Sequence, residues 1–200
     1  VKYYNSLSVY DHNLNLLNYY NKINLVPFGE FLPMENLLKK VGLKSLTNNY
    51  QSYSKGQKRE IIELNQNNFS IKFLPLICYE IIYSGKLYKN DDFDIIVNIS
   101  EDGWFGQSIG PEQHFVHSIF RAIESGKYVI RSANNGIAAI VNPFGIVEER
   151  INFNEVGYID FTKMRKIQPT VFSKYGNKIF GLIILLYIFL IFSFKKLRNE

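Results

Sequence analysis

Cys78 is the only cysteine of this 200-residue chain, and its position favours covalent chemistry. It ends an apolar run, residues 69–78, and Tyr79 and Glu80 follow it directly. Ligand sites of open α/β sheets gather at the carboxyl ends of strands. A helix that began there would favour the thiolate and offer backbone N–H groups to an oxyanion. A lone cysteine is more often a small buried apolar residue, so this interpretation depends on the other residues around it.

Two ionisable residues lie in apolar surroundings within a second string, YNKINLVPFGEFLP (residues 20–33). Lys22 has few charged neighbours in sequence, and Glu30 stands between Phe28 and Phe31. Burying an ammonium group costs free energy, so a partly buried lysine tends to have a task. On the residues alone, a surface lysine and a glutamate in a turn remain open alternatives.

A third string, NISEDGWFGQSIGPEQHF (residues 98–115), contains Trp104 and His114. His114 and His117 are three residues apart on a predicted helix, but no third metal ligand accompanies them. We therefore predict that these histidines lie on the helix surface and that the protein has no metal site. A Cys/His protease remains an alternative, although no histidine can be paired with Cys78 from the sequence.

The elements that would position these residues alternate between strand and helix. Strands are predicted at residues 7–10, 59–64, 69–78, 93–100, 127–132 and 136–142. The run at 93–100 is apolar almost throughout, as in a strand that is covered on both faces. The turn NPFG, residues 142–145, predicts a hairpin into the segment that follows.

A helix is predicted between the strands at 93–100 and 127–132. Pro111 fits its first position and Gly126 its end. Its apolar face is predicted to contain Phe115, Val116, Ile119, Phe120 and Ile123. The alternation of strands and helix indicates a mixed α/β layered domain.

The positive charge of the chain gathers at its C-terminal end. The net charge is +5, yet residues 163–200 hold eight Lys or Arg against one acid, while residues 1–162 hold fifteen against seventeen. These charges flank an uncharged apolar segment, residues 179–194. With its flanking residues, 177–195 is long enough for a membrane helix whose lysines reach the lipid headgroups. The sequence therefore favours a membrane anchor over a buried core helix, and argues against nucleic acid as a partner.

Taken in series, the three strings resemble the carbon–nitrogen hydrolase (nitrilase) superfamily and, within it, the apolipoprotein N-acyltransferases. The motifs are YNK..LVPFGE.LP, ICYE and NIS.D.WFG....P.QH. The resemblance implies an α/β fold, part of a nitrilase-type αββα sandwich, over residues 1–172. It also implies that one transmembrane helix, residues 177–195, follows this domain.

The resemblance also assigns roles to residues. Members of the superfamily use a Glu–Lys–Cys triad, whose lysine matches Lys22 and whose cysteine matches Cys78. Glu30, Tyr79, Glu80 and Trp104 match supporting residues of the acyltransferase site. The triad glutamate belongs on an earlier strand, but residues 1–21 contain no glutamate, and Asp11 is their only acid. We therefore expect the chain to be a C-terminal fragment that lacks the general base and is inactive alone.

The implied activity is transfer of a fatty acyl chain from a phospholipid to the N-terminal amine of a lipid-modified apolipoprotein. It would proceed through a thioester on Cys78, without a metal or organic cofactor. The implied location is the bacterial inner membrane with the catalytic domain on the periplasmic side, whereas the flanking charges alone weakly favour the cytoplasm. Alternatives are a nitrilase-type amidase that hydrolyses a small amide, and an inactive membrane-tethered remnant.

Overall fold

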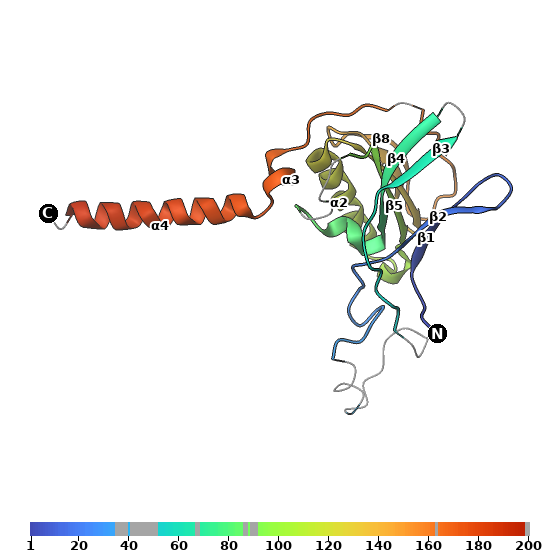
Figure 1. Cartoon of the computed structure of the whole chain (residues 1–200), viewed down its shortest axis with the longest axis horizontal. Helices are drawn as coiled ribbons and strands as arrows, with labels where there is room; N and C mark the ends of the chain where they lie inside the picture. Colours follow the sequence, from blue (N-terminus) through green and yellow to red (C-terminus); the bar gives the residue numbers. More distant parts are fainter. Residues whose placement is uncertain are drawn as a thin grey trace.

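The computed structural model describes residues 1–34, 40, 52–66, 69–85, 88, 92–162 and 164–198. In these residues, two strands form a hairpin and six form one mixed sheet (Figure 1). The hairpin consists of β1 (Ser6–Tyr10) and β2 (Leu16–Asn21). The sheet has the order β3 (Ile62–Gln66), β4 (Phe69–Ile77), β5 (Ile95–Glu101), β6 (Tyr128–Asn134), β7 (Ala138–Val141) and β8 (Val147–Ile151).

The parallel part of the sheet sets the place of the candidate site. β4, β5 and β6 are parallel neighbours, and the strands outside them pair in antiparallel fashion. The carboxyl ends of these three strands therefore meet at one edge. Two short 3-10 helices follow strands there: η1 (Cys78–Ile82) after β4 and η2 (Gly103–Phe105) after β5.

The sheet is covered on both faces. On one face, Leu74 and Leu76 of β4 join a core cluster with Phe115 and Ala122 of helix α2 (Gly110–Ser125). On the other face, strand residues join a second cluster that includes Leu7 and Tyr20 of the hairpin. The predicted α/β fold is confirmed, as are the covered strand β5 and the hairpin of β7 and β8 across the NPFG turn.

Two strands differ from the prediction. The sequence did not predict β2, because only Tyr20 of its residues is buried and the others show no apolar alternation. β3 begins at Ile62 rather than at residue 59, since Arg59 turns away from the sheet to bond Tyr20, Asn24 and Glu80.

Helix α2 has the predicted ends, but the prediction of its buried face was wrong for most residues. Pro111 lies in its first turn, and Gly126 ends it with a left-handed φ of 66°. Phe115 is buried, whereas Val116, Phe120 and Ile123 are exposed. The buried face instead holds polar residues, and three of them bond groups outside the helix: His114 bonds Asp102, Arg121 bonds the Tyr83 carbonyl, and Glu124 accepts from the Gly85 N–H. Ser118 and Ser125 are buried there as well.

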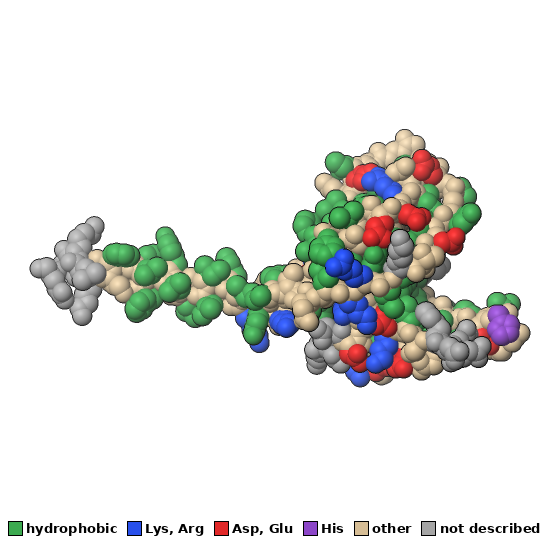
Figure 2. Space-filling model, turned by 90° about the horizontal axis from the view of Figure 1, so that it is seen from above, with side chains coloured by type: hydrophobic (Ala, Val, Ile, Leu, Met, Phe, Trp, Pro, Cys, Tyr) green, Lys and Arg blue, Asp and Glu red, His purple; other side chains and the backbone are tan. Residues whose placement is uncertain are grey.

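The chain continues through the short helix α3 (Val171–Tyr175) into a long apolar helix, α4 (Lys178–Arg198). Among the described residues, one helix is long and apolar enough to cross a membrane, with a mean hydropathy of 2.1 over Lys178–Lys195. None of the residues in that stretch is buried, and hydrophobic side chains project from both sides of the helix in Figure 2. The predicted long apolar helix is confirmed.

Candidate active site

Cys78 lies directly after β4, as predicted, at the first position of η1. Its φ is 52°, in the left-handed region that a residue with a Cβ rarely adopts, at a cost of roughly 1–3 kcal/mol. The turn leaves the thiol partly buried and Tyr79 partly exposed. The side chain is thus presented at the edge where the parallel strands end.

A buried Lys22 and a partly buried Glu30 form an ion pair beside the hairpin. Lys22 is 1% exposed, and its Nζ lies 2.9 Å from Oε2 and 3.0 Å from Oε1 of Glu30. Glu30 also accepts hydrogen bonds from Asn5 Nδ2 at 2.7 Å and from the backbone N–H of Val26 at 2.8 Å. A buried ammonium needs such a partner, and the pairing excludes the surface-lysine alternative.

Glu80 joins the turn of Cys78 to the segment around Lys22. Its carboxylate is fully buried and accepts hydrogen bonds from five residues on three segments. The donors are Ile77 N (2.9 Å), Tyr20 Oη (2.8 Å), Ile23 N (3.1 Å), Asn24 N (3.0 Å) and Arg59 Nη2 (2.6 Å). Ile77 precedes Cys78, and Ile23 follows Lys22. The carboxylate therefore fixes the nucleophile segment against the lysine segment, and we call Lys22, Glu30 and Glu80 the hairpin-side cluster.

Tyr20 remains a hydrogen-bond donor within this cluster. Burial and the neighbouring Glu80 carboxylate raise the pKa of the Tyr20 hydroxyl well above its ordinary value, although the Arg59 guanidinium opposes the shift. The hydroxyl therefore keeps its proton near neutral pH and donates a hydrogen bond to Glu80.

Trp104 and Asp11 stand apart from the buried cluster. Trp104 lies in η2, at the same edge of the sheet as Cys78, and its side chain is 70% exposed. Asp11 stabilises the turn of the β1–β2 hairpin by accepting hydrogen bonds from Asn13 N and Asn15 N. Hydrogen bonds from Asn15 lower the pKa of its carboxyl group.

The sequence did not predict a second buried cluster on the α2 side of the sheet. It contains Asn98, Asp102, His114 and Arg131, and we call it the helix-side cluster. Arg131 donates to Asp102 Oδ2 at 2.6 Å, and His114 Nδ1 lies 2.8 Å from Asp102 Oδ1. The prediction that His114 lies on the helix surface was wrong: it is 3% exposed, and among the described atoms its Nε2 has no hydrogen-bond partner.

Charges in the helix-side cluster stabilise one another. Burial alone would raise the pKa of Asp102, but hydrogen bonds from His114 and Ser100 and the charge of Arg131 outweigh it, so the pKa is lowered. Burial lowers the pKa of Arg131, and the Asp102 carboxylate opposes that shift. One signal was present in the sequence: Arg131 falls inside a predicted strand, where a charged side chain needs a buried partner.

The sequence profile of carbon–nitrogen hydrolases matches residues 1–165, which include both clusters and Cys78. The chain belongs to the carbon–nitrogen hydrolase family. It is homologous to apolipoprotein N-acyltransferases: it is 42% identical over 176 residues to that of Rickettsia prowazekii and 39% identical over 175 residues to that of Bradyrhizobium diazoefficiens. Each alignment covers 87% of this chain, but 34% and 32% of the relatives, so the chain spans about a third of their length.

Solved structures support the fold of this carbon–nitrogen hydrolase domain. An amidase from Nesterenkonia sp. superposes with a TM-score of 0.51 at 13% identity, over 76% of this chain and 52% of the amidase. A glutamine-dependent NAD+ synthetase from Acinetobacter baumannii superposes with a TM-score of 0.54 at 20% identity, over 76% of this chain and 27% of the synthetase. At these identities the likeness shows the fold alone.

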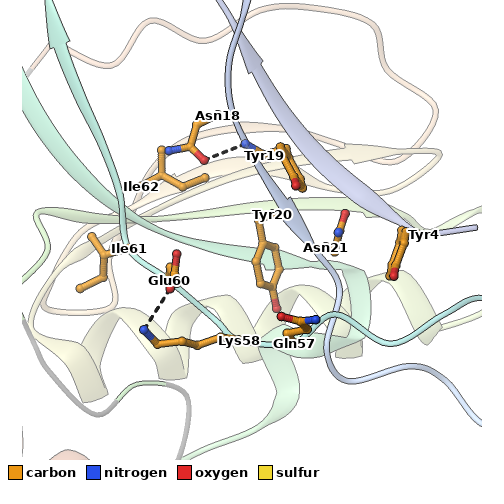
Figure 3. A pocket seen from close by; sticks show the side chains of 10 residues that line it. All are labelled: Tyr4, Asn18, Tyr19, Tyr20, Asn21, Gln57, Lys58, Glu60, Ile61 and Ile62. Carbon is orange, nitrogen blue, oxygen red and sulfur yellow. Dashed lines mark hydrogen bonds and ion pairs between the residues drawn. The ribbon is translucent and has the colours of Figure 1, made fainter. Parts of the chain in front are cut away.

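A cavity of about 520 Å³ opens beside the hairpin-side cluster, between β2 and the segment that leads into β3 (Figure 3). Tyr20 lines it, and the Tyr20 hydroxyl donates a hydrogen bond to Glu80. Neither Lys22 nor Cys78 lines this cavity. We therefore place the candidate chemistry at the sheet edge rather than in the cavity.

Proposed function

We propose that this chain is the C-terminal part of an enzyme that transfers a fatty acyl chain from a phospholipid to the N-terminal amine of a lipid-modified apolipoprotein. One observation carries the proposal: Glu80 fixes the segment that contains the buried Lys22 against the turn of Cys78. The homology to apolipoprotein N-acyltransferases supports the choice of substrates.

In the first half-reaction, the Cys78 thiolate attacks the ester carbonyl of the phospholipid. Negative charge develops on the carbonyl oxygen, and the Lys22 ammonium and the backbone N–H of Tyr79 stabilise it. The C–O ester bond then breaks. The lysophospholipid leaves as an alcohol, taking up the proton that the thiol gave to a general base, and the acyl chain stays on Cys78 as a thioester.

In the second half-reaction, the α-amine of the apolipoprotein attacks the thioester carbonyl. The C–S bond breaks, an amide forms, and the amine gives up a proton through the base so that Cys78 is restored. Glu30 is paired with Lys22 and Glu80 accepts several buried donors, so both carboxylates have structural tasks. We propose that the base is a glutamate on a strand outside these 200 residues.

The apolar helix α4 gives a physical reason for placing this chemistry at a membrane. Moving an acyl chain out of a bilayer costs about 0.8 kcal/mol for each CH₂ group. An enzyme that acts on a phospholipid ester therefore gains when its site lies against the lipid surface. We propose that α4 anchors the domain at the bacterial inner membrane, with the domain on the periplasmic side.

The decisive experiment follows the fate of the acyl group. The full-length enzyme would be incubated with a phospholipid that carries a labelled acyl chain, with and without a diacylated peptide bearing a free N-terminal cysteine amine. The proposal predicts labelled amide on the peptide and little free fatty acid. Release of free fatty acid at the same rate with and without peptide would instead indicate a hydrolase of the amidase type.

A further inference from the structure

A row of paired residues crosses the sheet next to Cys78. Leu76 of β4 is the register partner of Asn98 in β5, and Asn98 is the register partner of Arg131 in β6. Register partners in neighbouring strands project to the same face of a sheet. Asn98 and Arg131 therefore lie side by side on the α2 face, and both are buried.

The Asn98 side chain uses both ends of its amide. Its Nδ2 donates to the carbonyl oxygen of Leu76 at 3.1 Å and makes a longer contact, 3.5 Å, with the carbonyl oxygen of Cys78. Its Oδ1 accepts a hydrogen bond from Arg131 Nη1. Because Arg131 has donors only, it fixes which end of the amide faces it, and the NH₂ group must then face the two carbonyl oxygens.

Arg131 is itself held on its other sides. Its Nε donates to the carbonyl oxygen of Ile137 at 3.1 Å, and its Nη2 donates to Asp102 Oδ2 at 2.6 Å. Asp102 is fixed in turn by Ser100 Oγ at 2.6 Å and by His114 at 2.8 Å. The guanidinium is therefore locked in one orientation by β5, β6, α2 and the loop before β7.

We propose that Asn98 and Arg131 are positioning residues that aim the oxyanion-binding N–H of Tyr79; this inference rests on the proposed role of Cys78. The Cys78 carbonyl and the Tyr79 N–H belong to one planar peptide group, in which they point in opposite directions. Holding the carbonyl toward Asn98 therefore directs the N–H away from the sheet interior. The same contact helps to keep Cys78 at its left-handed φ of 52°.

Asn98→Asp tests the proposal, because aspartate keeps an acceptor for Arg131 but loses the donor to the two carbonyl oxygens. Acylation of Cys78 in the full-length enzyme would be measured with p-nitrophenyl butyrate, a soluble ester. Loss of one aligned oxyanion donor costs about 10²–10³ in rate. We expect the acylation rate constant to fall by about 10–100-fold with little change in KM, since partial misalignment costs less than removal of a donor.

Ser100→Ala is the matched control. It removes one hydrogen bond to Asp102, which stays bonded to His114 and Arg131, so Asn98 and Arg131 keep their contacts and the acylation rate should stay close to that of the wild type. Arg131→Lys keeps a charge beside Asp102 but loses the guanidinium N–H that bonds Asn98. Its acylation rate should lie between those of Asn98→Asp and the wild type. If Asn98→Asp fails to fold, the Arg131→Lys result decides. Wild-type acylation in the folded variant, or an equal loss in Ser100→Ala, would overturn the proposal.

Amide hydrogen exchange of the peptide spanning residues 76–82 gives a readout that does not depend on substrate. Backbone that opens more often exchanges faster. We expect faster exchange in Asn98→Asp than in Ser100→Ala, and equal exchange in the two would contradict the proposal. If even the wild type forms no acyl-enzyme, the proposed function fails, while the exchange result still reports whether Asn98 holds the turn.

Discussion

The two clusters both contact the segment around Cys78, but they hold different elements in place. The hairpin-side cluster (Lys22, Glu30, Glu80) joins segments more than fifty residues apart: Glu80 bonds the backbone that follows Lys22, and the Lys22 ammonium pairs with Glu30. The helix-side cluster (Asn98, Asp102, His114, Arg131) joins adjacent strands and α2, and it reaches Cys78 through a backbone carbonyl and through the charge of Arg131. We propose that the hairpin-side cluster supplies charge to the reaction and that the helix-side cluster supports the turn.

Substitution of Cys78, the proposed nucleophile, should have the largest effect on activity. Cys78→Ala should abolish amide formation in the full-length enzyme, because no thiolate remains to accept the acyl group. Cys78→Ser should also be inactive, since a hydroxyl is far less ionised than a thiol near neutral pH. The measurement is labelled peptide product per enzyme. Acyl transfer by Cys78→Ala would show that Cys78 is not the nucleophile.

Lys22 should have the next largest effect. Lys22→Ala should lower kcat/KM by about 10²–10³, the usual cost of losing an oxyanion-stabilising group. Lys22→Arg should not restore activity, because the guanidinium is larger and its charge is spread. Lys58, an exposed lysine paired with Glu60, is the control. Lys58→Ala should retain wild-type activity, and equal rates for Lys22→Ala and Lys58→Ala would make Lys22 structural.

Glu80→Gln should act mainly on stability. The amide cannot accept all the donors that converge on the carboxylate, and it removes the negative charge that pairs with Arg59. Hydrogen bonds to a charged group contribute about 1.5–3 kcal/mol, so the free energy of unfolding should fall by about that amount. Urea unfolding monitored by fluorescence would measure it. Glu60→Gln at an exposed site should leave the unfolding midpoint unchanged, and a similarly small effect at Glu80 would contradict its assigned role.

The helix-side cluster should affect how the stability of the protein falls at acidic pH. The pKa of Asp102 is lowered from 3.8 in the folded protein, so its contribution is complete above that value and is lost as pH falls through the folded pKa. Asp102→Asn should therefore unfold more easily than wild type at pH 7, and the difference should shrink below about pH 3.8. Thermal unfolding between pH 2 and 7 measures it, and a difference that stays constant with pH would contradict the pairing with Arg131.

The sequence predicted the hairpin-side cluster better than the helix-side cluster for a physical reason. Lys22 and Glu30 lie within one short string and Glu80 lies beside Cys78, so local context marked each of them. Asn98, His114 and Arg131 lie on three separate elements, and only the strand register and the rotation of α2 bring them together. The apolar residues of α2 predicted the wrong rotation of the helix about its axis. Its buried face holds polar residues with partners, and Val116 and Phe120 are exposed.

The helices and strands divide in the same way, into those that the local sequence predicted and those that it did not. Strands with a continuous apolar character, such as β4 and β5, could be predicted, as could the ends of α2, which Pro111 and Gly126 mark. β2 could not be predicted, since it is held by pairing with β1 and by one buried tyrosine rather than by an apolar pattern.

The most direct test of the account is to look for the acyl group on Cys78 itself. The full-length enzyme would be mixed with phospholipid in the absence of an acceptor peptide, digested, and examined by mass spectrometry with and without neutral hydroxylamine. We predict a fatty acyl mass on the peptide that contains Cys78, removed by hydroxylamine as a thioester should be. An acyl group on another residue, or none on Cys78 while transfer proceeds, would contradict it.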